Sequence, residues 1–127
     1  MKIEHLAIWT HQLDTLRDFY MTYFNGRTNT KYTNPHTGFS SYFITFAGGA
    51  RLELMQRADI LPRQGENERT GLAHLAVSVG SETAVNNLTN RLRRDGYPVI
   101  SEPRTTGDGY YESVILDPDG NRIEITV

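Results

Sequence analysis

An internal repeat limits the folds open to this chain more than any other feature. Residues 3–9 read Ile-Glu-His-Leu-Ala-Ile-Trp, and residues 72–78 read Leu-Ala-His-Leu-Ala-Val-Ser. A second match lies further along, where Arg-Leu-Glu-Leu at 51–54 recurs as Arg-Ile-Glu-Ile at 122–125. The histidines are 69 residues apart (74 − 5) and the glutamates 71 (124 − 53). Offsets that agree this closely indicate one module used twice.

Each half shows the same order of predicted elements. A strand comes first, at 2–9 and 72–79, and an amphipathic helix follows it. Asp14 and Ser81 are expected to cap the two helices, and Gly26 and Gly96 to end them. Three shorter strands complete each half, at 28–34, 40–47 and 50–56 and again at 98–105, 110–116 and 121–127.

The predicted class is therefore α+β. We expect one domain over residues 1–127, built from two βαβββ modules at about 1–61 and 71–127. The polar stretch 62–70 would link the two modules.

Composition excludes several classes of protein. The 127 residues carry a net charge of −2, and no basic face is present that would predict nucleic-acid binding. The chain has no cysteine, which excludes disulfides, thiol nucleophiles and cysteine-based zinc sites. No apolar stretch has the length of a signal peptide or a membrane span. We expect a soluble, cytoplasmic protein without a membrane partner.

Four residues of metal-ligand type recur at matched places in the two halves. Because side chains alternate along a strand, His5, Glu53, His74 and Glu124 all fall on the less apolar faces of their predicted strands. Nearby carboxylates repel each other unless a cation lies between them. Two imidazoles and two carboxylates suit a first-row divalent ion. These four residues are the predicted metal site.

The sequence at this point resembles the vicinal oxygen chelate superfamily, which includes glyoxalases, bleomycin-resistance proteins and extradiol dioxygenases. The resemblance is closest to glyoxalase I and covers nearly the whole chain. It rests on the two modules, the order His, Glu, His, Glu, the closing segment Leu-Asp-Pro-Asp-Gly-Asn-Arg-Ile-Glu at 116–124 and Asp-Phe-Tyr at 18–20. It implies a concave half-barrel that holds the metal and a small-molecule substrate, with Glu124 as both ligand and base.

Two positions depart from the pattern of bacterial glyoxalase I. Trp9 stands where that family has an arginine that contacts glutathione, and Arg57 stands where it has an asparagine. The aromatic ring and the cation suit a different acidic substrate. We expect Trp9, Arg57 and Tyr110, in the loop 107–110, to shape substrate choice.

The resemblance implies a metal-dependent lyase or isomerase of the glyoxalase I-like type that works through an enediolate-like intermediate. Glu124 is the first candidate for the base and Glu53 the second. Nickel, cobalt or zinc is the expected ion, and a homodimer is the expected assembly. Two alternatives stay open: a metal-dependent dioxygenase or thiol transferase of the same superfamily, and a metal-free protein that binds a ligand as bleomycin-resistance proteins do.

Overall fold

A computed structural model describes residues 1–62 and 70–127. The chain divides into two compact units, residues 1–65 and 66–127, and each is described by itself. Each unit is a mixed sheet with one helix on it, so the α+β class and the two repeated modules are confirmed. That the two units form one domain stays a prediction. The expected linker falls mainly on 63–69, outside the described residues.

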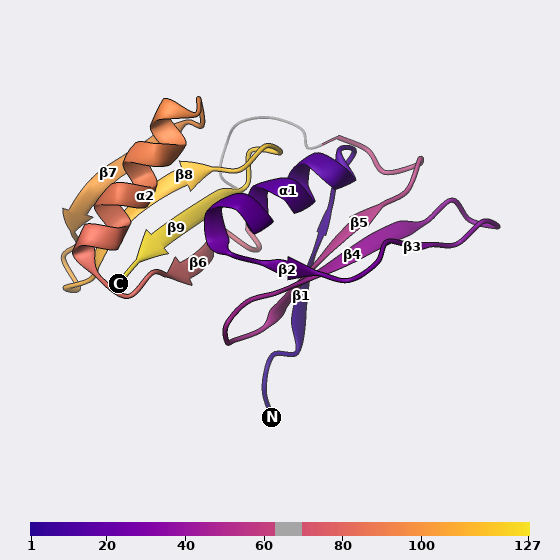
Figure 1. The fold of residues 1–127 in the computed structure, drawn as a ribbon, viewed down its shortest axis with the longest axis horizontal. Coiled ribbons are helices and arrows are strands. Elements are labelled where there is room, and N and C mark those ends of the chain that lie inside the picture. The colour runs from indigo at the N-terminus through magenta and orange to yellow at the C-terminus, as the bar shows by residue number, and fades with distance from the viewer. Residues whose placement is uncertain (63–69) are drawn as a thin grey trace. The chain divides into compact units, whose positions relative to one another are not determined.

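The first unit contains β1 (His5–Trp9), α1 (Leu13–Phe24), β2 (Arg27–Thr28), β3 (Tyr32–Thr33), β4 (Ser40–Thr45) and β5 (Arg51–Gln56). Its sheet runs in the order β1-β5-β4-β2, and β3 also pairs with β4 (Figure 1). Strands β1 and β5 are parallel, whereas the other pairs are antiparallel. The first and last strands of the module are therefore neighbours.

The second unit repeats this plan with β6 (Leu75–Ser78), α2 (Glu82–Arg94), β7 (Val99–Thr105), β8 (Tyr111–Leu116) and β9 (Arg122–Thr126). Its sheet order is β6-β9-β8-β7, with β6 parallel to β9 and the remaining pairs antiparallel (Figure 1). The parallel pair again joins the first and last strands of the module.

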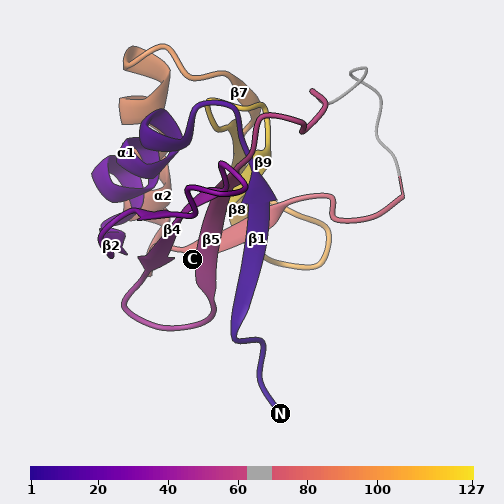
Figure 2. The same ribbon diagram turned by 90° about the vertical axis from the view of Figure 1, so that its right-hand side faces the viewer.

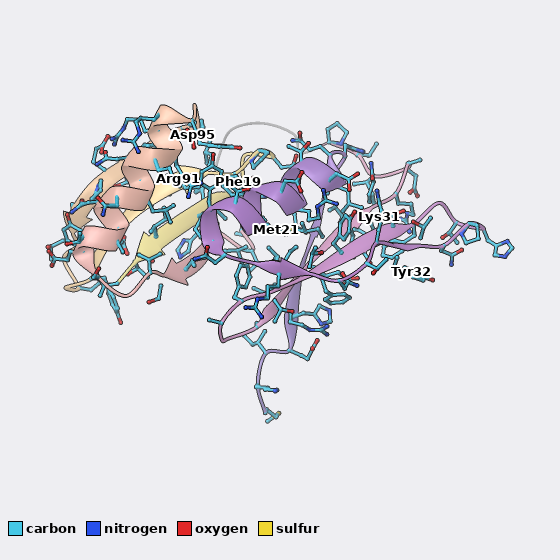
Figure 3. The ribbon with its side chains drawn as sticks, viewed as in Figure 1. Phe19, Met21, Lys31, Tyr32, Arg91 and Asp95 are labelled. Atoms are coloured by element: carbon cyan, nitrogen blue, oxygen red, sulfur yellow. The ribbon has the colours of Figure 1, made fainter. Side chains whose placement is uncertain are left out.

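The core of the first unit lies between α1 and one face of its sheet (Figure 2). The helix buries its apolar stripe because the apolar positions recur every three or four residues. Figure 3 labels Phe19, which is buried, and Met21, which is exposed two positions later. The buried apolar side chains are Leu13, Leu16, Phe19, Tyr20, Phe24, Tyr42, Ile44, Leu52 and Leu54.

The core of the second unit is smaller and partly polar. Its buried apolar residues are Val85, Leu92, Ile115, Ile123 and Ile125. The fully buried hydroxyls of Thr89 on α2 and Ser113 on β8 share a 2.7 Å hydrogen bond, and Thr89 Oγ1 also donates to the carbonyl of Val85. This pair satisfies two polar groups that would otherwise destabilise a dry core.

The helix ends agree with the sequence in one unit and differ in the other. Ser81 caps α2, accepting a hydrogen bond from the Ala84 amide, and Gly96 follows the last turn with a φ of 92°. The prediction that Asp14 caps α1 is wrong. Gln12 occupies the N-cap position without a side-chain capping bond, and Asp14 lies inside the first turn, where its carboxylate accepts hydrogen bonds from Tyr42 and Lys31.

The predicted stop at Gly26 is displaced by one residue. Asn25 takes the left-handed conformation that ends α1, with a φ of 54°. Gly26 comes next and serves another purpose, since a Cβ there would lie 2.5 Å from Cγ2 of Ile44. Glycine is needed at 26 for a close approach of the backbone to β4.

The single strand expected at 28–34 is two short strands, β2 and β3. Asn29 follows β2, and its side-chain oxygen accepts a hydrogen bond of 2.8 Å from the Phe43 amide on β4. A side chain thus takes a place that a backbone carbonyl would hold in a regular ladder, which interrupts the strand.

Within residues 1–62 and 70–127, neither α1 nor α2 has the length and apolar character that spanning a membrane requires.

Candidate metal-binding pairs

The first unit places His5 and Glu53 side by side on its two parallel strands. In the register of β1 and β5, Glu53 stands opposite Ala7, and His5 lies two residues earlier on the same face of β1. His5 Nε2 is 3.7 Å from Glu53 Oε2. Burial alternates as the sequence predicts, since Leu52 and Leu54 are buried whereas the Glu53 face is not. The apolar residues that anchor β5 thereby hold the carboxylate on the opposite face.

The second unit builds the same pair from the same places. Glu124 stands opposite Ala76 in the register of β6 and β9, and His74 lies two residues before Ala76. His74 Nε2 is 3.5 Å from Glu124 Oε2. In both units the histidine is 41–46% exposed and the glutamate 16–18% exposed. Both pairs can therefore be reached from solvent.

The spacing within each pair fits two ligands of one ion. Ligand atoms about 2.1 Å from a divalent ion stand roughly 3.0 Å apart at a right angle and roughly 3.4 Å apart at a tetrahedral angle. Separations of 3.7 and 3.5 Å need only a small closure to reach these values. Among the described residues, however, no cluster of three or more His, Cys, Asp or Glu is close enough to hold a metal. Each unit offers two candidate ligands.

His5 is held by three further side chains of its own unit. Its Nδ1 lies 2.5 Å from Glu4 Oε2, and the other oxygen of Glu4 accepts from Nε of Arg51 at 2.8 Å. The hydrogen bond to His5 is the largest cause that lowers the pKa of Glu4, and Arg51 lowers it further. Phe43 meets the His5 ring edge-on at 5.5 Å and lies 4.2 Å from the Arg51 guanidinium carbon.

Glu124 has a different neighbour, a second carboxyl group on β8. Burial raises the pKa of Glu112, and the hydrogen bond and negative charge of Glu124 raise it further. Arg104 opposes these effects in part, with Nη1 3.9 Å from Glu112 Oε1. Two adjacent carboxyl groups hold a proton more tightly than either would alone.

Trp9 and Arg57 are in contact and belong to a larger aromatic cluster, and their role in binding a substrate stays a prediction. Arg57 Cζ lies 5.3 Å from the Trp9 ring centroid, while Arg57 Nε donates to Asp59. Phe39 meets Trp9 edge-on at 6.1 Å between centroids, and its ring is tilted against that of Tyr32 at 6.2 Å. Figure 3 labels Tyr32, which is 52% exposed. The cluster presents aromatic surface to solvent beside one guanidinium.

Tyr110 lies in a hydrogen-bonded turn before β8. Its amide donates to the Thr106 hydroxyl at 3.2 Å, and its carbonyl accepts from the Thr106 amide at 2.8 Å. Its ring is exposed, and within the described chain no hydrogen bond or ring contact joins it to His74 or Glu124. Its role in substrate choice stays a prediction.

Sequence reasoning missed Glu4, Phe43, Phe39 and Glu112. Strand alternation would have indicated Glu112, which lies two residues from Val114, the register partner of Glu124. No repeat signal marks Glu4 or Phe43, because the matching positions are Ala73 and Val114.

Sequence comparisons identify relatives of this chain. A family profile, described as the Glyoxalase/Bleomycin resistance protein/Dioxygenase superfamily, matches residues 2–125. The uncharacterized protein YqjT of Bacillus subtilis is 37% identical over 60 residues. That segment covers 45% of this chain and 47% of YqjT.

Solved structures share the fold at low identity. A glyoxylase/bleomycin resistance protein/dioxygenase domain from a Frankia species gives a TM-score of 0.83 at 20% identity, covering 100% of this chain and 97% of that one. The trypanothione-dependent glyoxalase I of Leishmania major gives 0.79 at 21% identity, covering 99% and 86%. Glyoxalase I from Zea mays gives 0.80 at 20% identity and covers 98% of this chain, which spans only 44% of the maize chain.

Proposed function

Because the chain belongs to the Glyoxalase/Bleomycin resistance protein/Dioxygenase superfamily, we propose that it is a metal-dependent lyase or isomerase of the glyoxalase I-like type, acting on a small oxygenated substrate. One observation carries this proposal. Two His–Glu pairs stand at equivalent places in the two units, with N–O separations of 3.7 and 3.5 Å. A solvated surface glutamate has no physical reason to recur beside a histidine in this way.

The proposed ligands of one divalent ion are His5, Glu53, His74 and Glu124. Nickel, cobalt and zinc all suit two nitrogen and two oxygen ligands, and such a set discriminates weakly among them. Such an ion, when bound, acts as a Lewis acid on substrate oxygens and stabilises negative charge that develops on them.

The protein's own part in the chemistry is proton transfer. Glu124 is the proposed base, taking a proton through a carboxylate oxygen from the carbon next to a substrate carbonyl. Its neighbour Glu112, whose pKa is raised by burial and by Glu124, is the proposed group that orients it. Glu53, at the equivalent place in the other unit, is the proposed second carboxylate, which would return the proton.

The aromatic cluster supports a substrate with an apolar or planar body and an acidic group. Trp9 lies four residues beyond His5 on the same face of β1, roughly 13 Å along the strand at about 3.3 Å per residue. The ring would contact the body of the substrate, and the Arg57 guanidinium beside it would attract an anion. Tyr110 is a further proposed contact. Lyase activity on the methylglyoxal–glutathione adduct should be weak, since Trp9 and Arg57 replace the expected glutathione contacts.

We also propose that the protein assembles as a homodimer, so that the four ligands meet either within one chain or across two copies. In both arrangements the ion is held by the His–Glu pair of a first unit and the His–Glu pair of a second unit.

Metal content tests the proposal directly. Purified wild-type protein, loaded with Co²⁺ or Ni²⁺ and dialysed, should retain one ion per chain, as measured by elemental analysis. His5→Ala and Glu124→Gln should lose most of it, because each removes one ligand of four. Glu124→Gln should also abolish exchange of the substrate carbon proton with solvent deuterium, once a thermal-shift screen of small oxo-acids and hemithioacetals identifies a substrate.

His36→Ala is the matched control, since His36 is an exposed histidine in the turn before β4 and should leave metal content unchanged. Full metal retention in both ligand variants would place the ion elsewhere. Tight binding of a small molecule by wild-type protein that holds no metal would favour the metal-free binding function instead.

A further inference from the structure

The two histidines of the paired sites differ in what their second ring nitrogen contacts. His5 Nδ1 lies 2.5 Å from Glu4 Oε2. His74 follows Ala73, which has no polar side chain, and its one contact of this kind in the described part of the chain is with Glu124. The two units therefore differ in whether a carboxylate contacts the Nδ1 atom of the histidine.

The contact with Glu4 determines which nitrogen of neutral His5 carries the proton. An ionised carboxylate only accepts hydrogen bonds, so Nδ1 must be the donor. Nε2 then keeps a free lone pair, and this nitrogen is the one 3.7 Å from Glu53. The ring is thus arranged with its ligating atom toward the paired glutamate before any ion arrives.

Glu4 is itself fixed from the neighbouring strand. Its Oε1 accepts from Arg51 Nε at 2.8 Å, its backbone carbonyl accepts from the Arg51 amide at 3.0 Å, and Oε2 is left for His5. The Arg51 guanidinium carbon lies over the Phe43 ring, and Phe43 and His5 form a T-shaped ring pair. The second unit has Val114 in place of Phe43 and Ala73 in place of Glu4.

We propose that Glu4 is a positioning residue for His5, which with Arg51 holds the ring in the Nδ1–H tautomer and directs Nε2 toward the ion. A carboxylate on the far nitrogen of a ligating histidine fixes the ring and strengthens its ligand nitrogen. This inference rests on the proposed function for the ion, but the tautomer itself can be measured without one.

The first measurement uses the metal-free protein. Nitrogen-15 NMR of the histidine rings, at a pH where imidazoles are neutral, reports the tautomer of each ring. Wild-type His5 should be in the Nδ1–H form, and Glu4→Ala should shift it toward the Nε2–H form. Glu4→Gln should retain it, because the amide oxygen can still accept. His74 serves as the internal reference and should not respond to either substitution.

The second measurement is Co²⁺ affinity, obtained by competition with a chelator. Glu4→Ala should weaken binding by about 10- to 100-fold, and Glu4→Gln by less. Glu102→Gln is the matched control. It removes an exposed glutamate that also pairs with an arginine, Arg93, and it should leave both the tautomer and the affinity unchanged.

The two proposals fail in different ways. An Nε2–H tautomer in wild-type His5, or a tautomer unaffected by Glu4→Ala in a variant that keeps the wild-type thermal midpoint, would overturn the role of Glu4. If wild-type protein binds no Co²⁺, the metal-dependent function fails, and the NMR result still decides whether Glu4 sets the tautomer.

Discussion

The two units carry the same His–Glu pair on the same strands but surround it with different side chains. In the first unit the histidine is braced by Glu4, Arg51 and Phe43. In the second the glutamate is the supported partner, beside Glu112. The two units share the His–Glu pair and its place beside the parallel strands, whereas the side chains behind the pair differ. The histidine of the first pair thus has a carboxylate neighbour, whereas the glutamate of the second pair has a carboxyl neighbour.

The strongest test of this comparison is to remove one pair at a time. The double variants His5→Ala/Glu53→Ala and His74→Ala/Glu124→Ala should each lose the ion and all activity, because neither unit offers more than two ligands. Metal content and turnover measure this. If one double variant retained the ion, the two pairs would not contribute to a single site.

Mixing the two double variants then separates the possible assemblies. After joint unfolding and refolding, a dimer that combines pairs from different chains would recover about a quarter of the wild-type sites. Sites built within one chain would recover none. Light scattering on the same samples checks that dimers have formed.

The core of the second unit contains a buried pair of hydroxyl groups, and removing one of them should have a smaller effect, on stability. Thr89→Val keeps the shape of the side chain but leaves the buried Ser113 hydroxyl without its 2.7 Å partner. We expect a loss of about 1–3 kcal/mol in the free energy of unfolding, measured by urea denaturation. The double variant Thr89→Val/Ser113→Ala should recover part of that loss. If it were less stable than either single variant, the hydroxyl pair would not be the cause.

The smallest expected effect concerns the surface of the first unit. Tyr42, Lys31 and Arg17 all bind the Asp14 carboxylate, and the hydrogen bond from Tyr42 is the largest cause that lowers its pKa below 3.8. A lowered pKa in the folded state stabilises the protein above the ordinary pKa, and that stability is lost as the pH falls through the folded value.

Asp14→Asn should therefore lower stability at pH 7 by no more than about 1 kcal/mol, since the group is largely exposed. The difference from wild type should shrink below about pH 4. Thermal midpoints at pH 7 and pH 3 measure this. Asp18→Asn, which leaves the Tyr42 and Lys31 contacts in place, should show a smaller change with pH.

The sequence predicted those features that depend on neighbouring residues or that recur in both halves of the chain. Alternation placed Glu53 and Glu124 on the faces opposite buried neighbours, and the cap at Ser81 followed from its own residue type. Prediction failed where a distant group competed. The Asp14 carboxylate binds Tyr42 and Lys31 and does not cap α1, and Asn29 interrupts a strand by bonding to β4. The strand order was not predictable, because pairing between remote segments leaves no trace in local spacing.

If the proposed ion binds, the parallel pairing of the first and last strands ties its binding to the order of folding. His5 and Glu53 are 48 residues apart (53 − 5), and His74 and Glu124 are 50 apart (124 − 74). These are among the longest-range contacts within each unit, and such contacts form slowly because a long loop must close first. A nascent chain that lacks β5 or β9 has a histidine but no paired carboxylate. Each His–Glu pair therefore forms only when its unit is complete, and the proposed ion would stabilise completely folded units over partly folded ones.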